Sequence, residues 1–174
     1  MAGNNPGPIS QFVFLPLPKL MNKSQLVQLL KQQLQDRYER TIQALEGATE
    51  AATGDDTKAE SKYDTRGLEA SYLAAGQAGQ ADELAEAIAL LETAEFPELD
   101  FEDPVQPGAL VEVDQEGNSN WYLLAPAGGG LTLEPGEGEP VTVLGPSAPL
   151  RTALLGKAAG DSLDHPRLTV LEVM

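Results

Sequence analysis

The chain contains no cysteine and only one histidine, His165. The absence of cysteine excludes disulfides, thiolate catalysis and cysteine-based zinc sites. It also fits a reducing compartment, and we expect a cytoplasmic protein. With a single histidine, any site that needs two imidazoles is excluded within one chain.

Basic residues are scarce as well. Eleven Lys and Arg stand against 27 Asp and Glu, which gives a net charge of −16. Such a surface repels duplex DNA and anionic membranes at moderate salt, so we expect neither autonomous DNA binding nor a membrane partner. Acidic chains of this kind more often meet basic protein surfaces or metal ions.

The N-terminal residues 1–20 lack both a membrane span and a basic secretory start. Their apolar run, residues 12–17, is too short to cross a bilayer, and Pro16 and Pro18 forbid a regular helix. A more orderly pattern begins at Met21. We therefore expect residues 1–20 to be a disordered extension or leader, or a misplaced start, without a function of their own.

Helical periodicity begins at Ser24, the expected N-cap, and runs in two arms. Apolar and small residues recur at three- and four-residue steps: Val27, Leu30, Leu34, Tyr38, Thr41, Leu45, Ala48 and Ala52, then Ala70, Leu73, Ala74, Gln77, Ala81, Leu84, Ile88 and Leu91. Two such stripes joined by a short turn predict an antiparallel helical hairpin, ~45 Å long. An ordinary dimerisation coiled coil is the alternative.

The turn of the hairpin is expected near residues 53–58, where Gly54 suits the end of a helix. Basic residues lie on the first arm and just past this turn, whereas residues 67–106 contain none and accumulate acids. Residues 96–107 are rich in proline and acidic residues, which predicts an extended linker.

From residue 108 the pattern becomes that of strands. Strands are expected at residues 109–113, 120–125, 131–133, 141–144 and 167–173, with a hairpin turn at 114–119 and a short helix at 150–155. The glycines at 128–130 open no helix and lack a following Lys-Ser/Thr, so they predict a hairpin loop rather than a phosphate loop. Residues 108–174 should form a small antiparallel-sheet domain.

The most specific pattern is Pro-Leu-Arg-Thr-Ala-Leu-Leu-Gly-Lys-Ala-Ala-Gly-Asp at residues 149–161. It resembles the polymerase-docking segment of the GreA/GreB transcript-cleavage factors, roughly Ser-Pro-aliphatic-x-x-Ala-Leu-aliphatic-Gly-Lys-x-x-Gly-Asp. Ala148 stands where that family usually has serine. The resemblance implies that Pro149 and Leu150 contact RNA polymerase. Alternatively, Pro149 only sets the start of a helix and Leu150 belongs to the core.

The order of the elements resembles the same family: a helical hairpin at 21–95, a linker at 96–107 and an FKBP-like domain at 108–174. Trp121-Tyr122 and Tyr72-Leu73-Ala74-Ala75 add to the resemblance. The expected fold class is therefore α+β, with a coiled-coil hairpin before an FKBP-like antiparallel-sheet domain. The resemblance implies a bacterial, monomeric factor that docks at the rim of the RNA polymerase secondary channel and inserts its hairpin.

In that family, carboxylates at the hairpin tip help to hold a second Mg²⁺ and orient water, so that the polymerase cuts its own backtracked RNA. The resemblance implies this role for Asp55, and the sequence places Asp56 beside it as a second candidate metal ligand, with Glu60 one turn into the second helix. The factor would then be an accessory rather than an enzyme. It would share Mg²⁺ with the polymerase, bind none tightly by itself, and meet the RNA 3′ end only within the complex.

The tip departs from the family pattern Gly-Asp-Leu-Ser-Glu-Asn-Ala-Glu-Tyr. Aligned on Gly54-Asp55, the chain keeps the Asp but has Lys58 where the Glu belongs. Aligned on Tyr72, it has Thr65 and Leu68 at the two acidic positions. The first alignment is preferred because it leaves the turn at the end of the hairpin.

Two functions therefore stay open. One is stimulation of RNA cleavage through the acidic tip. The other is a non-cleaving regulator that occupies the channel and blocks or modulates the active centre, in which case Asp56 only caps the second helix.

Overall fold

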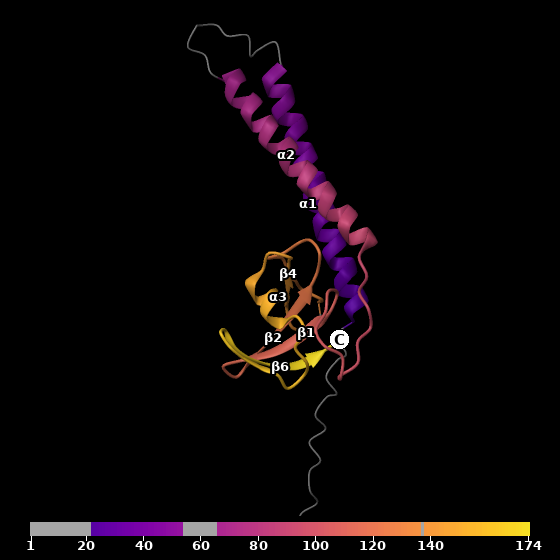
Figure 1. The fold of residues 1–174 in the computed structure, drawn as a ribbon. Helices are drawn as coiled ribbons and strands as arrows, with labels where there is room; N and C mark the ends of the chain where they lie inside the picture. The colour runs from indigo at the N-terminus through magenta and orange to yellow at the C-terminus, as the bar shows by residue number, and fades with distance from the viewer. Residues whose placement is uncertain (1–21, 54–65, 137) are drawn as a thin grey trace, which may run out of the picture.

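The computed structural model describes residues 22–53, 66–136 and 138–174 (Figure 1). Within these ranges the elements are α1 Lys23–Thr53, α2 Arg66–Thr93, β1 Leu110–Gln115, β2 Asn118–Leu124, β3 Thr132–Leu133, β4 Val141–Leu144, α3 Pro149–Leu154, β5 Ser162–Asp164 and β6 Arg167–Val173. The α+β class is confirmed, because two long helices precede a small sheet domain.

The helices α1 and α2 pack side by side along their length and form the rod in Figure 1. The side chain of Asn22 accepts a hydrogen bond from the Gln25 amide at 3.2 Å, so α1 begins at Lys23. The predicted N-cap at Ser24 is wrong, because Asn22 caps the helix two residues earlier.

The inner face of α2 follows a heptad pattern. Its heptad positions, all buried or half-buried, are Ala70, Ala74, Gln77, Ala81, Leu84, Ile88 and Leu91. Leu73, which the sequence also assigned to this stripe, is 56% exposed because it lies off the heptad. A methyl group added at Gly76 or Gly79 would meet nothing within 4 Å, so neither glycine serves close packing between the two helices.

The sheet has the strand order β3-β4-β2-β1-β6-β5. Every neighbouring pair is antiparallel except β2 and β4, which run parallel with Trp121 opposite Val141. The expectation of a wholly antiparallel sheet is corrected at this pair. The segment 125–140 is long enough for the crossover that parallel strands need, about a dozen residues.

Two features of the strands differ from expectation. The turn between β1 and β2 uses only Glu116 and Gly117, with φ of 57° and 84°, because two positive φ angles allow a two-residue hairpin. The strands therefore extend into the predicted turn at 114–119. Strand β5, which pairs with β6, was not predicted.

The two faces of the sheet carry two different cores. Alternate residues such as Leu110 and Val111 point to opposite faces, as the pleat requires. One face packs against the base of the hairpin through Leu26, Leu30, Leu34 and Leu91. The other packs against α3 and residue Val105 of the linker. The sheet is thus the middle layer between the hairpin base and α3.

The linker is fixed at both ends. Lys23 is only 4% exposed, and its ammonium group donates a hydrogen bond to the carbonyl of Pro97. Gly108 has φ of 85°, and a Cβ there would lie 2.5 Å from the carbonyl oxygen of Glu95. These contacts tie the segment after α2 to the start of α1 and to the sheet. No helix in the described ranges is long and apolar enough to cross a membrane.

Candidate functional site

The predicted tip residues Asp55, Asp56 and Glu60 lie outside the described residues, as does Lys58. The roles of these tip residues therefore stay predictions. In the part of the chain that is described, no group of three or more His, Cys, Asp or Glu side chains is arranged to hold a metal ion.

The predicted docking residues lie at the start of α3. Pro149 is exposed at the first position of the helix, where its missing N–H costs no hydrogen bond. Ala148 precedes it and supplies no side-chain cap. Leu150 is half-buried against the core between the sheet and α3, and Leu154 is fully buried in that core. Pro149 and the outer part of Leu150 thus remain available to a partner.

Arg151 fixes the position of α3. It is 9% exposed, and its Nη1 donates hydrogen bonds to the carbonyl oxygens of Ala125 and Leu144, which follow β2 and end β4. Burial lowers the pKa of its guanidinium below the ordinary value. No role for Arg151 is predicted from the sequence. Its only signal was a charged residue inside the otherwise apolar start of the segment 149–155.

The rest of the docking-like segment forms a turn that returns the chain to the sheet. Gly156 and Gly160 have φ of 78° and 91°, which explains glycine at both positions. The carboxylate of Asp161 accepts a hydrogen bond from the Ala158 amide at 2.9 Å and closes the turn. These three residues of the motif therefore have local structural roles.

The same turn is joined to the linker. The amide of Val105 donates to the carbonyl of Lys157 at 2.7 Å, and the amide of Gly156 donates to the carbonyl of Val105 at 2.8 Å. A hollow of about 430 Å³ lies beside this junction, lined by Ala94, Glu95, Pro97, Gln106, Pro107, Gly108, Pro126 and Arg151. The segment 149–161, the linker and the hairpin base are thus held in one continuous structure.

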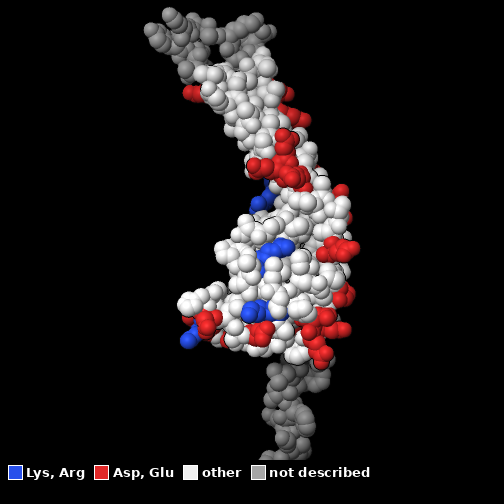
Figure 2. Space-filling model, viewed as in Figure 1, with Lys and Arg blue, Asp and Glu red and all other residues white. Residues whose placement is uncertain are grey.

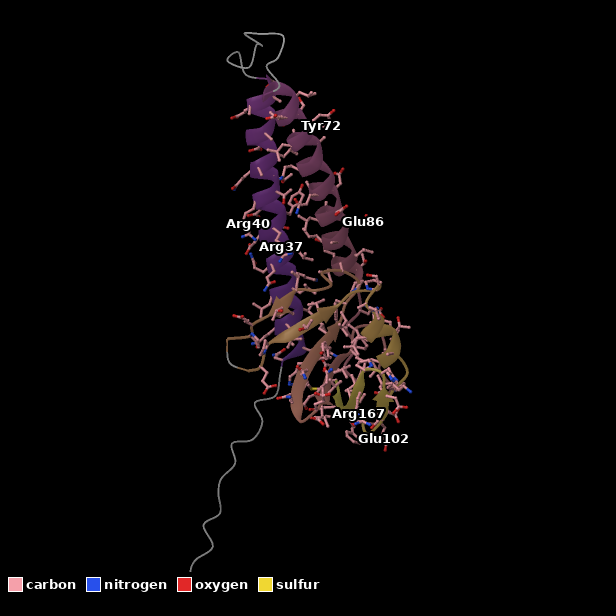
Figure 3. All side chains as sticks on the ribbon, turned by 90° about the vertical axis from the view of Figure 1, so that its left-hand side faces the viewer. Arg37, Arg40, Tyr72, Glu86, Glu102 and Arg167 are labelled. Atoms are coloured by element: carbon pink, nitrogen blue, oxygen red, sulfur yellow. The ribbon has the colours of Figure 1, made fainter. Side chains whose placement is uncertain are left out.

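The outer half of α2 exposes large side chains. Leu68 and Leu73 are each 56% exposed and Tyr72 is 71% exposed, so these large side chains face away from α1. Figure 3 shows Tyr72 on the part of α2 farthest from the sheet. On the face seen in Figure 2, acidic side chains gather along the hairpin and the lower part of the sheet domain, and basic ones are few.

No protein-family model matches the chain, and the comparison with curated proteins found no match. Among solved structures, the chain is similar to GreA factor homolog 1 (Gfh1) of Thermus thermophilus, with 22% identity over 83% of this chain and 94% of that one and a TM-score of 0.33. A second structure of the transcription factor Gfh1 gives 22% identity, 85% and 95% coverage and a TM-score of 0.35. Gfh1 of Thermus aquaticus gives 21% identity, 85% and 96% coverage and a TM-score of 0.34. Because all three TM-scores are low, the function proposed below is based on the residues of this chain.

Proposed function

We propose that this chain is an accessory factor of RNA polymerase that docks through its sheet domain and places its hairpin in the secondary channel. The observation that carries the proposal is the shared packing of the hairpin base and α3 on opposite faces of one sheet. A domain that docks through Pro149 and Leu150 would thereby set the direction of the hairpin. The factor would work in the cytoplasm as a monomer.

The tip would act on the active site of the polymerase. Asp55 and Asp56, with Glu60 nearby in the sequence, offer the hard carboxylate oxygens that Mg²⁺ prefers. A second Mg²⁺ shared with the polymerase would stabilise the charge that develops when a phosphodiester bond is hydrolysed. In this proposal the chain supplies and orients ligands and is not itself the enzyme. The backtracked RNA 3′ end is met only inside the complex.

A second candidate is favoured by Lys58, which stands where the related factors carry the second tip acid. A lysine cannot serve as a carboxylate ligand, and its charge would oppose a nearby metal ion. The hairpin would then occupy the channel and block or modulate the active centre without promoting cleavage. Both candidates use the same docking surface and differ only at the tip.

The test is RNA shortening in backtracked elongation complexes of the cognate polymerase at limiting Mg²⁺. We expect the wild-type protein to accelerate shortening and Asp55→Asn with Asp56→Asn to abolish the acceleration. Asp82→Asn with Glu83→Gln removes the same charge from exposed positions on α2 and should leave the rate unchanged. Binding without acceleration would assign the regulator instead.

Docking is tested separately by the affinity for core polymerase. Pro149→Ala removes an exposed side chain at the start of α3 and should weaken binding about tenfold. Thr152→Ala changes an exposed neighbour on the same helix and serves as the control. Equal affinities for Pro149→Ala and wild type would argue against docking through α3.

A further inference from the structure

Arg37 and Arg40 lie next to each other on α1, at the root of the projecting part of the hairpin (Figure 3). Leu34, one turn earlier, still packs in the core that α1 shares with the sheet, and Gln33 still donates to the carbonyl of Thr132. The two arginines border a notch of about 330 Å³ between the helices. Its lining consists of Arg37, Arg40, Thr41, Gln77, Gln80 and Leu84.

Neither arginine has an ion-pair partner among the described residues, in a chain with 27 acids and 11 bases. The acids nearest in sequence are engaged with other side chains. Asp36, one turn before Arg40, accepts a hydrogen bond from Gln32 at 2.7 Å, and Glu39 accepts one from Gln35 at 3.2 Å. Two exposed guanidinium groups therefore remain free for an external anion.

The chemistry of the lining selects the kind of anion. Each guanidinium presents several N–H donors in a planar fork, and the amide groups of Gln77 and Gln80 add neutral donors. The hydroxyl of Thr41 is already committed to the carbonyl of Arg37 at 2.9 Å. Leu84 supplies an apolar wall. A carboxylate carried on a short methylene stem matches donors on one side and an apolar wall on the other.

A nucleic-acid strand fits this position less well. The exposed acids Asp82 and Glu83 lie within three residues of Gln80 on α2. A strand of phosphates would bring several negative charges toward these acids and toward a chain of net charge −16. A single carboxylate on a protein surface brings one charge into the notch.

We infer that the notch between Arg37, Arg40, Gln77 and Gln80 binds an Asp or Glu side chain on the protein surface along which the hairpin lies. The inference rests on the proposed function, in which that surface is the wall of the polymerase channel near its entrance. The arginine fork would fix how far the hairpin enters, because a bidentate contact has a defined geometry.

The test compares affinities for core polymerase without nucleic acid, over a range of salt concentrations. Arg37→Gln with Arg40→Gln should weaken binding tenfold or more and reduce the salt dependence. The control, Lys31→Gln with Arg167→Gln, removes the same charge. Lys31 lies about 120° around α1 from Arg37, and Arg167 is on β6. Both double variants should melt at the wild-type temperature, since Arg37, Arg40 and Arg167 are exposed and the half-buried Lys31 belongs to neither core.

The outcomes separate this inference from the proposed function. If the wild-type protein binds core polymerase and the variant with Arg37→Gln and Arg40→Gln binds it with the same affinity, the inferred carboxylate site at the notch is wrong. The proposed function is then unaffected. An equal loss in the control would overturn it too, since total charge would explain the effect. The same variants are also compared on backtracked elongation complexes, and a loss of affinity seen only there would make RNA the ligand and contradict the carboxylate. No binding by the wild-type protein would remove both proposals.

Discussion

A single guanidinium, that of Arg151, connects α3 to two strands of the sheet. Arg151→Met keeps much of the volume but leaves the carbonyl oxygens of Ala125 and Leu144 without this donor. We expect a loss of about 2 kcal/mol in the free energy of unfolding, measured by urea denaturation. The exposed neighbour Thr152→Ala should change it by less than about 0.5 kcal/mol. Comparable effects of the two changes would show that Arg151 does not hold α3.

Burial of Lys23 makes the free energy of unfolding depend on pH in the alkaline range. Burial lowers the pKa of its ammonium group from 10.5, and the negative charge of Glu98 offsets part of that effect. The unfolded chain therefore keeps this proton at pH values where the folded chain has lost it. Stability should rise with pH in the window below 10.5. The free energy of unfolding of wild type, minus that of Lys23→Met, should increase as pH approaches that value, and a decrease would contradict the burial of Lys23.

Among the helices, α2 contains two glycines whose replacement should stabilise the protein. Gly76 and Gly79 are exposed, helical and free of neighbours at the Cβ position. Replacing both by alanine should raise the free energy of unfolding by about 1–2 kcal/mol, because alanine loses less backbone entropy in a helix.

The matched control for this pair is Gly108→Ala, which adds the same methyl group. Gly108 has φ of 85° and lies against the carbonyl of Glu95, so this change should destabilise the protein. If Gly76→Ala with Gly79→Ala also destabilised it, α2 would need these glycines for a reason that its packing does not show.

Local patterns predicted most elements but not their distant pairing. The heptad spacing of α2 and the alternation in β1 and β2 are properties of neighbouring residues, and both were read from the sequence. The parallel pairing of β2 with β4 depends on the path of the segment 125–140, which no local period encodes. Strand β5 is three residues long and was missed because it is too short for an alternating pattern.

The candidate site was predictable to different degrees. The motif at 149–161 predicts that Pro149 and Leu150 contact a partner, and the structure gives them an exposed and a half-buried position; the contact itself stays a prediction. The role of Arg151 could not be predicted, since its acceptors lie 7 and 26 residues away in sequence. The tip acids Asp55, Asp56 and Glu60 stay predictions.

At the scale of the whole molecule, the hairpin base and the sheet share one core. Leu91 of α2 is fully buried beside Leu110 and Leu123, and the only tryptophan, Trp121, packs against the same cluster. Leu91→Ala should lower the free energy of unfolding by about 2–5 kcal/mol. Circular dichroism reports the loss of helix, and Trp121 fluorescence reports unfolding of the sheet domain. The two signals should change at the same urea concentration. If the helices melted first, the hairpin and sheet would not be one cooperative unit.

In the proposed function, the hairpin brings its tip to the active centre of RNA polymerase. Because the chain has no cysteine, Thr53→Cys at the exposed end of α1 gives one attachment point for an iron chelate that produces hydroxyl radicals. In a complex with core polymerase, we expect cleavage of the catalytic subunits close to the active-site Mg²⁺. The same chelate at Arg167→Cys, on β6, should cut only the outer surface. Cleavage from Thr53→Cys confined to the polymerase surface, or none in a complex shown to form, would contradict the account.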